Sequence, residues 1–279
     1  AEFTDRWRTP GDRSAHQWEE RFGELHYEPV GQDAWDAALK AAGVTAGEID
    51  RLVVTGTNER AVRRIRGRLG VADGALVDDL SSSIGNTGTA HPLLLLVAAL
   101  EAADPGDVVA LLHLSDGADG LVMRVTDARA GWRPRRTVSA QIAAGGPVAY
   151  GKMLAWRGMA SVQPPNRPPP DRVSAPASAR NRDWKFGLAT GEFGPLGHQE
   201  GTVNAFTVDR LAYSPSPPVV FAVVDFDGGR RLPVELTDVD EGDVSIGARV
   251  EMTFRRLSTS GGLANYFWKA RPVRVEQAG

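Results

Sequence analysis

The 279-residue sequence contains no cysteine. Disulfide bonds, thiolate metal sites and a cysteine nucleophile within this chain are therefore excluded. Long hydrophobic runs are also missing, because the longest apolar stretch, residues 92–100, is too short to span a bilayer. The charged first stretch, residues 1–13, lacks the apolar core of a signal peptide. These absences predict a cytoplasmic protein without a membrane span.

Neither sign of charge is in strong excess. The chain carries 32 Lys and Arg residues against 35 Asp and Glu, a formal net charge of -3. Nucleic-acid binding depends on Lys and Arg that neutralise phosphates, so this balance disfavours nucleic acid as a main partner. The hydrophobic content of 42% and the charged content of 24% are those of an ordinary soluble globular protein.

Residues 1–128 alternate between helix and strand signals, which is typical of an α/β layered unit. The last strand signals flank "SDGADG", residues 115–120, as in a hairpin. Helices are expected over residues 33–43, 58–70 and 89–103, and a buried strand over residues 49–56. We therefore expect a first domain that layers helices on a sheet.

Residues 129–185 differ in composition and are expected to link two domains. They contain a short helix signal at 149–160 and then six prolines between residues 161 and 178. Such a proline-rich stretch is typical of an extended, semi-rigid tether.

Residues 186–279 change to a β pattern. Short β-rich runs, separated by turn residues, occupy residues 201–213, 219–227, 230–238, 248–257 and 266–275. Five strands within so short a stretch predict a small Greek-key barrel of the OB type.

Two motifs of the first domain place polar residues at the ends of predicted elements. "VVTGTNER" follows the buried strand, and "IGNTGTAHP" forms a turn directly before an apolar helix. Such a turn can present a polar side chain at the mouth of a buried helix. The two motifs contain the candidate residues Thr55, Asn58, Arg60, Gly85, Asn86 and Gly88.

With these motifs and the glycine-rich hairpin after them, residues 33–127 resemble the C-terminal half of the thiolase superfamily, above all β-ketoacyl-ACP synthase III and HMG-CoA synthase-like enzymes. Residues 184–275 resemble the OB-fold domain that accompanies thiolases and HMG-CoA synthases. The resemblance implies an α/β thiolase-like half-domain followed by an all-β OB-fold barrel, joined by the Pro-rich tether. Relatives usually place a four-cysteine zinc ribbon before the barrel. His198 alone cannot replace it, so neither zinc nor another cofactor is expected.

The resemblance also assigns roles to the first motif. In the ketoacyl synthases a strand ends in His-x-x-Asn-x-Arg, and Asn58 and Arg60 match its Asn and Arg. Thr55 stands at the position of the catalytic His, and a threonine cannot do the work of an imidazole near neutral pH. Arg60 matches a position that faces the phosphates of CoA or of a carrier protein. The alternative is a solvated helix face shared by Arg60, Arg63, Arg64, Arg66 and Arg68.

For the second motif, the resemblance identifies Asn86 with a catalytic Asn whose amide completes an oxyanion hole or positions an acyl thioester. Gly85 and Gly88 flank it, and Gly117 belongs to the hairpin that packs under the active site, so these glycines are expected at the substrate. The alternative is that Asn86 caps the apolar helix. His91, in the same motif, is expected to pack within that helix.

The superfamily's nucleophilic cysteine belongs to an N-terminal half that this sequence does not contain. A lone half would expose the apolar face that its twin covers, at about 25 cal/mol per Å². We therefore expect an oligomer, formed with a thiolase-like subunit or separate half that carries the cysteine, or by self-association. Otherwise the sequence is a fragment of a longer protein.

The first functional hypothesis is an incomplete acyltransferase of lipid metabolism. It takes part in acyl-CoA carbon–carbon bond formation or cleavage, with CoA or an acyl carrier presenting the acyl group, and supplies Asn86 and Arg60 to a composite site. The second is a catalytically inactive scaffold that guides acyl-CoA within a thiolase complex. The third is an OB-fold that binds single-stranded nucleic acid through mixed basic and aromatic residues. Those residues are Arg255, Arg256, Tyr266, Phe267, Trp268, Lys269 and Arg271.

Overall fold

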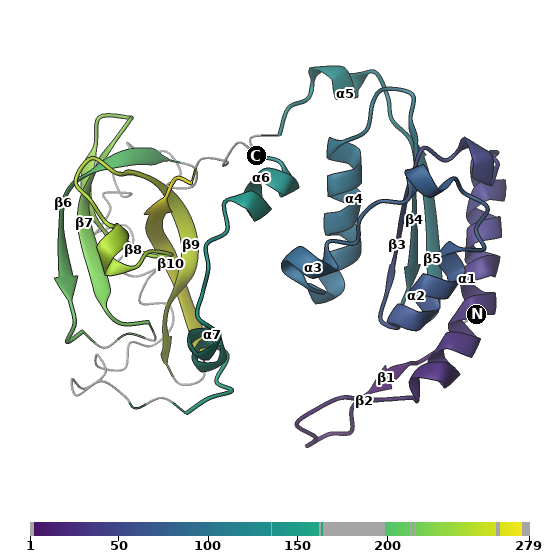
Figure 1. Ribbon diagram of the computed structural model, residues 1–279, viewed down its shortest axis with the longest axis horizontal. Coiled ribbons are helices and arrows are strands. Elements are labelled where there is room, and N and C mark those ends of the chain that lie inside the picture. Colours follow the sequence, from purple (N-terminus) through teal and green to yellow (C-terminus); the bar gives the residue numbers. More distant parts are fainter. Residues whose placement is uncertain are drawn as a thin grey trace. The chain divides into compact units, whose positions relative to one another are not determined.

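The computed structural model describes residues 3–134, 136–161, 163, 199–212, 214, 216–260 and 263–274 (Figure 1). The chain divides into two compact units, Ala1–Ala143 and Ala144–Gly279, here unit 1 and unit 2. The domain limits at 128 and 185 stay a prediction. Most of the proline-rich tether, and His198, lie outside the described residues. No described helix is long and apolar enough to cross a membrane.

Unit 1 is built around a three-stranded sheet. Its helices and strands are β1 (Arg6–Trp7), β2 (His16–Gln17), α1 (Glu20–Ala42), β3 (Arg51–Gly56), α2 (Glu59–Arg66), α3 (Ser81–Ile84), α4 (His91–Glu101), β4 (Val108–Leu114), β5 (Ala118–Arg124), α5 (Ala128–Gly131) and α6 (Val138–Ala143). In the sheet order β3-β4-β5, β3 runs parallel to β4 and β4 antiparallel to β5. β1 and β2 pair separately as a short antiparallel ribbon. The predicted α/β layered unit is confirmed.

The helix α1 begins earlier than the sequence predicts, at Glu20 rather than near residue 33, and it continues through Pro29. A proline inside a helix removes one backbone hydrogen bond and normally disfavours continuation. Burial outweighs this cost, because Tyr27 and Trp35, on either side of the proline, are 0% and 1% exposed. The longer helix brings its first two turns against α2.

Helices pack against both faces of the sheet, and alternate residues along each strand point to opposite faces. On one face, α1 and α2 pack against Leu52 and Val54 of β3. On the other face, α4 packs Leu95 and Ala99 against Val53. Figure 1 shows α1 and α4 on opposite sides of the sheet. The candidate residues lie at the ends of the strands rather than on these helix-covered faces.

Unit 2 is a closed five-stranded barrel. Its elements are α7 (Tyr150–Trp156), β6 (Glu200–Asp209), β7 (Val219–Phe226), β8 (Arg231–Leu236), β9 (Arg249–Ser260) and β10 (Leu263–Pro272). The strands close in the order β10-β8-β7-β6-β9, because β6 pairs with β9 and β10 pairs with both β8 and β9. Val203, Val224 and Ala270 belong to its apolar interior. The predicted barrel is confirmed, and α7 confirms the short helix expected before the tether.

Gly120 of β5 allows α1 to approach the sheet closely. A Cβ at this position would lie 2.7 Å from the carbonyl oxygen of Ala34 on α1. Because backbone atoms cannot move aside as a flexible side chain does, we expect Gly120→Ala to lower the free energy of unfolding by about 1–3 kcal/mol. Chemical denaturation measures this difference. Gly47→Ala is the control, since a Cβ there meets nothing within 4 Å. Equal stability of the two variants would contradict this packing.

Candidate functional site

Thr55 lies near the carboxyl end of β3 and is 6% exposed. It shares the α4 side of the sheet with Val53, because the two residues are two positions apart on one strand. Its partner in the parallel register is His113 of β4. Burial lowers the pKa of His113, the Thr55 backbone and Asp119 oppose this effect, and a nearby His91 lowers the pKa further. Position 55 therefore has imidazoles near it but carries none itself.

His91 connects these strand ends to the Gly-Asn-Thr turn. It is the first residue of α4 and is 4% exposed, so the expected packing role is confirmed. The Thr87 backbone N–H donates to His91 Nδ1 at 3.5 Å. The turn, the start of α4 and the carboxyl ends of β3 and β4 thus form one neighbourhood.

Asn86 is exposed and folds its side chain back on its own turn. Its Oδ1 accepts a hydrogen bond from the Gly88 N–H at 2.8 Å, as in an Asx turn. The cap interpretation is wrong, because a 3-10 turn, Gly88–Ala90, separates Asn86 from α4, and the N-cap residue of α4 is Ala90. Within the described part of the chain, Asn86 Nδ2 has no hydrogen-bond partner and can still donate to a ligand.

The three glycines of the predicted site all occupy turns with positive φ. Gly85 and Gly88 have φ values of 65° and 71°, and Gly117 has a φ of 128° between β4 and β5. Residues with a Cβ rarely adopt such angles. These glycines therefore fix the paths of the two turns. Contact with a substrate stays a prediction for each of them.

Asn58 is 5% exposed and uses both ends of its amide for structure. Its Oδ1 accepts from the Ala61 N–H at 3.0 Å and caps α2. Its Nδ2 donates to the Glu20 carbonyl oxygen at 3.0 Å. Gly23 makes room for this contact, because a Cβ there would lie 2.6 Å from Asn58 Nδ2. Asn58 thus joins the start of α1 to the start of α2.

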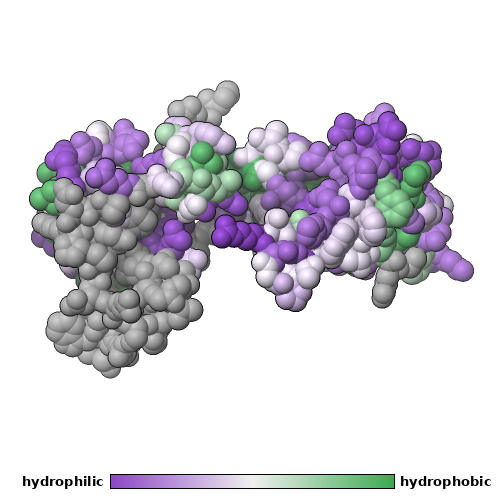
Figure 2. All heavy atoms as spheres, turned by 90° about the horizontal axis from the view of Figure 1, so that it is seen from below, coloured by the Kyte–Doolittle hydropathy of each residue, from purple (hydrophilic) through white to green (hydrophobic). Residues whose placement is uncertain are grey.

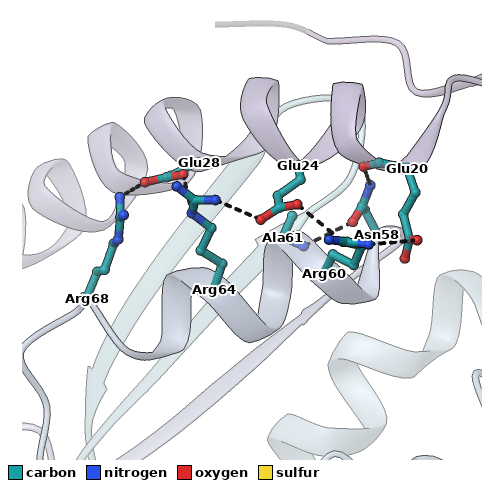
Figure 3. Close-up of polar contacts among 8 residues, drawn as sticks. All are labelled: Glu20, Glu24, Glu28, Asn58, Arg60, Ala61, Arg64 and Arg68. Atoms are coloured by element: carbon teal, nitrogen blue, oxygen red, sulfur yellow. Dashed lines mark hydrogen bonds and ion pairs between the residues drawn. The ribbon is translucent and has the colours of Figure 1, made fainter.

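Arginines of the α2 segment alternate with glutamates of α1 in a continuous ladder of ion pairs (Figure 3). Its glutamates are Glu20, Glu24 and Glu28, and its arginines are Arg60, Arg64 and Arg68. Residues spaced by four lie on the same face of a helix, so both rows can face each other along several turns. The ladder fixes the orientation of α1 against α2.

Arg60 lies at the end of this ladder nearest Asn58. Its Nε donates to Glu24 at 3.3 Å, and its Nη1 lies 3.7 Å from Glu20. Arg64 bridges Glu24 and Glu28 at 2.9 and 2.7 Å. A phosphate contact of Arg60 stays a prediction, and it would require the guanidinium to exchange its carboxylate partners. The carboxylate row is a feature that the sequence analysis missed, although its four-residue spacing in "EERFGELHYE" is visible.

Arg66 positions the segment before the Gly-Asn-Thr turn, which the sequence analysis also missed. Its Nη2 donates to the Val54 carbonyl oxygen at 2.8 Å and to Asp79 at 3.3 Å. Asp79 in turn accepts from the Ser81 N–H at 3.0 Å at the start of α3. β3, α2 and the entry to the turn are therefore held together by one guanidinium.

The barrel surface neutralises most of the cations expected to bind nucleic acid. Arg255 pairs with Asp238 and Arg271 with Glu251, each at 2.8 Å, and Lys269 pairs closely with Glu235. Each cation that pairs with a carboxylate is less available to a phosphate. The third functional hypothesis therefore loses most of its electrostatic basis.

The aromatic residues of β9 and β10 form a partly exposed group. Phe254 contacts Tyr266 and Trp268, with ring centroids 5.8 and 5.2 Å apart. Phe254 and Tyr266 are 52% and 50% exposed, whereas Trp268 packs against the barrel core. Within the described residues, no three His, Asp or Glu side chains gather as metal ligands would.

Family comparisons agree with this architecture. Residues 39–123 match the family described as 3-oxoacyl-[acyl-carrier-protein] synthase III C terminal. Residues 195–255 match the family described as ChsH2, C-terminal OB-fold domain. The resemblance and the fold class predicted from the sequence are confirmed: the chain joins a thiolase-like α/β half-domain to an OB-fold domain.

Two curated relatives match about a quarter of the chain, and both are named DUF35 domain-containing scaffold protein. The one from Methanocaldococcus jannaschii is 30% identical over 79 residues, and the one from Methanothermobacter thermautotrophicus is 29% identical over 78. Each match covers 26% of this chain. The matched part spans 56% and 59% of those relatives.

Solved structures with parts similar to this chain are also found. One, titled Ltp2-ChsH2(DUF35) aldolase, is 24% identical, covers 27% of this chain and 58% of its own, and has a TM-score of 0.23. Another, a β-ketoacyl-[acyl carrier protein] synthase III from Thermus thermophilus, is 22% identical, covers 43% of this chain and 41% of its own, and has a TM-score of 0.36.

The ladder makes unit 1 sensitive to acid. The hydrogen bond from Arg64, helped by Arg60, holds the pKa of Glu24 below its ordinary value of 4.5. A carboxylate whose folded pKa is lowered stabilises the fold above its ordinary pKa, and this contribution is lost as the pH falls through the folded value. We expect the free energy of unfolding to fall below pH 4.5 and Glu24→Gln to remove part of that fall. Urea denaturation across this pH range measures it.

Asp33→Asn is the matched control for this experiment. Asp33 is an exposed carboxylate of the same helix, and no ion pair of Asp33 is found among the described residues. The control should keep the full dependence on pH. A Glu24→Gln variant that also keeps the full dependence would contradict the assigned role of the ladder.

Proposed function

We propose that this chain is a scaffold subunit of a thiolase-like assembly that forms or cleaves carbon–carbon bonds of acyl-CoA substrates. The chain holds no cysteine, and buried Thr55 occupies the position that the resemblance gives to the catalytic His. Asn58 and Arg60 are engaged in helix packing. Both curated relatives carry the name scaffold protein, which supports this choice over an enzyme complete in itself.

The observation that carries the proposal is the uncovered side of α4. This helix has one charged residue, Glu101, among its eleven residues. Leu95 and Leu96 bury one side against the sheet, yet Leu93 is 62% and Val97 43% exposed on the outer side. A helix that is apolar all round is normally buried all round. The proposal therefore assigns the outer side to a partner.

The sheet beside α4 extends this apolar surface. Leu121 of β5 pairs with Leu111 and so faces the α4 side of the sheet, where it is 46% exposed. On the α1 side, α1 contacts β4 and β5 and α2 contacts β3, whereas the main sheet contacts of α4 are with β3 and β4. A thiolase-like unit that brings the cysteine and a further helix would complete the layer. The OB-fold barrel would then serve to dock or guide the CoA-linked substrate.

A second candidate is a composite active site, in which this chain contributes one group to chemistry that the partner completes. Asn86 supports this composite site. Its turn is exposed, and its Nδ2 donates no hydrogen bond to any described residue. An amide donor of this kind can stabilise the oxyanion of a thioester. The two candidates differ only in whether Asn86 takes part in turnover.

We expect Leu93→Asp to weaken the complex with a cysteine-bearing thiolase-like subunit by about 2 kcal/mol or more, roughly thirtyfold in Kd. The charge would have to be buried in the interface, while the isolated unit would tolerate it on an exposed position. Copurification followed by mass spectrometry identifies the subunit, and titration of the purified subunits measures the Kd. Ala37→Asp on the exposed side of α1 is the control. Copurification without any cysteine-bearing subunit would refute the scaffold function.

We expect Asn86→Ala to leave the turnover of the assembled complex unchanged. A scaffold places no group at the reacting atoms, so the loss of one amide should affect neither kcat nor assembly. If Asn86 instead donates to an oxyanion, the same change should lower kcat by about 10²-fold or more. Steady-state kinetics of the reconstituted complex separate the two candidates, and a large fall in kcat would select the composite site.

A further inference from the structure

The amino-terminal arm, residues 3–22, carries a row of exposed aromatic side chains. The rings of Trp7 and Trp18 lie 4.9 Å apart, and those of Trp18 and Phe22 lie 5.1 Å apart. These three side chains are 39%, 45% and 40% exposed. Figure 2 views unit 1 from the side on which β1 and β2 lie in Figure 1, and shows apolar surface among hydrophilic side chains.

The base of the arm is firmly attached to the β3–α2 turn. Asp5 is 3% exposed and accepts a hydrogen bond from Thr57 Oγ1 at 3.3 Å. Arg6 donates to the Thr57 carbonyl oxygen at 3.1 Å. Trp18 Nε1 donates to the Thr4 carbonyl oxygen at 3.0 Å. Trp18 and the start of β1 are therefore held in place before any partner arrives, which lowers the entropy lost on binding.

The free tip of the arm has little other support. β1 and β2 contribute two residues each, and an isolated two-stranded ribbon is marginally stable in water. Trp7 of this ribbon stacks on His16, with ring centroids 6.0 Å apart, and contacts Trp18. Because Trp7 and Trp18 are both exposed, a partner that covers them would stabilise the ribbon.

Residues 3–22 carry four arginines and four carboxylates, but the exposed charges that lack a described partner are mainly positive. Arg8, Arg13 and Arg21 are exposed, and no described carboxylate pairs with them. The carboxylate of Asp12 is held by His16 at 3.1 Å. Glu20 pairs with Arg60 in the ladder. Glu19 is the exposed carboxylate of the arm that has no partner among the described residues. The arm therefore favours an acidic partner surface.

We propose that the amino-terminal arm is a second docking surface of unit 1 and that it binds an acidic, apolar pocket on the thiolase-like partner. Tryptophan and arginine are the residues that most often dominate protein–protein binding energy, and the arm presents both. This proposal rests on the proposed function, because it takes the same cysteine-bearing subunit as its partner. A protein is favoured over nucleic acid because the chain as a whole has a net charge of -3.

The test compares the purified full-length chain and its variants for binding to the copurified cysteine-bearing subunit. We expect Trp7→Ala to raise the Kd at least about tenfold, as for an interface hot spot. Arg8→Glu combined with Arg13→Glu should raise it by a similar factor and reduce its dependence on salt. The charge variants keep the aromatic row and therefore test the surface even if Trp7→Ala loosens the ribbon.

Matched controls lie elsewhere on unit 1. Trp132→Ala removes another exposed tryptophan, 47% exposed on the segment after α5, and Arg63→Glu reverses an exposed arginine of α2. Both should leave the Kd within about twofold, as is usual for surface residues outside an interface. Unchanged affinity of the arm variants would overturn the docking surface and leave the scaffold function intact.

Two other results are informative. If no cysteine-bearing subunit copurifies, the proposed function and the docking surface both fail. If the arm variants instead lose binding to a labelled single-stranded oligonucleotide while binding the subunit normally, the surface belongs to nucleic acid and the proposal is overturned.

Discussion

The burial of Leu95, Leu96 and Ala99 of α4 against the sheet determines where the candidate site of unit 1 lies. This packing places the first residue of α4, His91, beside the carboxyl ends of β3 and β4. It also fixes the Gly-Asn-Thr turn, because Thr87 donates to His91. The same helix leaves Leu93 and Val97 exposed on its outer side. The element that organises the site is thus also the one that needs a partner.

The polar groups around the site serve mainly to hold elements together. Asn58 uses both ends of its amide between α1 and α2, and Arg66 links β3 to the entry of the turn. Arg60 contributes to the ladder with Glu20 and Glu24. Position 55 holds a threonine and the chain lacks cysteine, whereas Asn86 keeps an amide donor that bonds to no described residue. A scaffold accounts for this distribution better than a self-sufficient enzyme.

The sequence predicts best what depends on local pattern. Alternating β-rich runs predict the five barrel strands, and the hairpin signal predicts β4 and β5, because strand alternation and turn residues are local features. The start of α1 is missed for a physical reason. Two of its four buried positions, Gly23 and Gly31, are glycines, so the helical spacing of buried residues is hidden from an apolar pattern. Pro29 conceals it further.

The site is harder to predict because its partners are distant in sequence. From the sequence, the arginine row of α2 suggests a solvated helix face. In the fold, Glu24 and Glu28 lie opposite this row, and Glu24 is 40 positions from Arg64 in the chain. Asn86 suggests a helix cap, because a cap depends only on residues close in sequence. In the fold, a 3-10 turn lies between Asn86 and the first residue of α4. Motifs identify which residues gather at the strand ends, and only the fold shows which of them are already engaged.

The central claim is that the outer side of α4 is covered by a cysteine-bearing thiolase-like subunit. Because the chain has no cysteine, Leu93→Cys creates a single attachment point for a photo-crosslinker. In the assembled complex we predict a covalent adduct between position 93 and that subunit, and none from Lys40→Cys on exposed α1. No adduct from position 93, or equal adducts from both positions, would contradict the account.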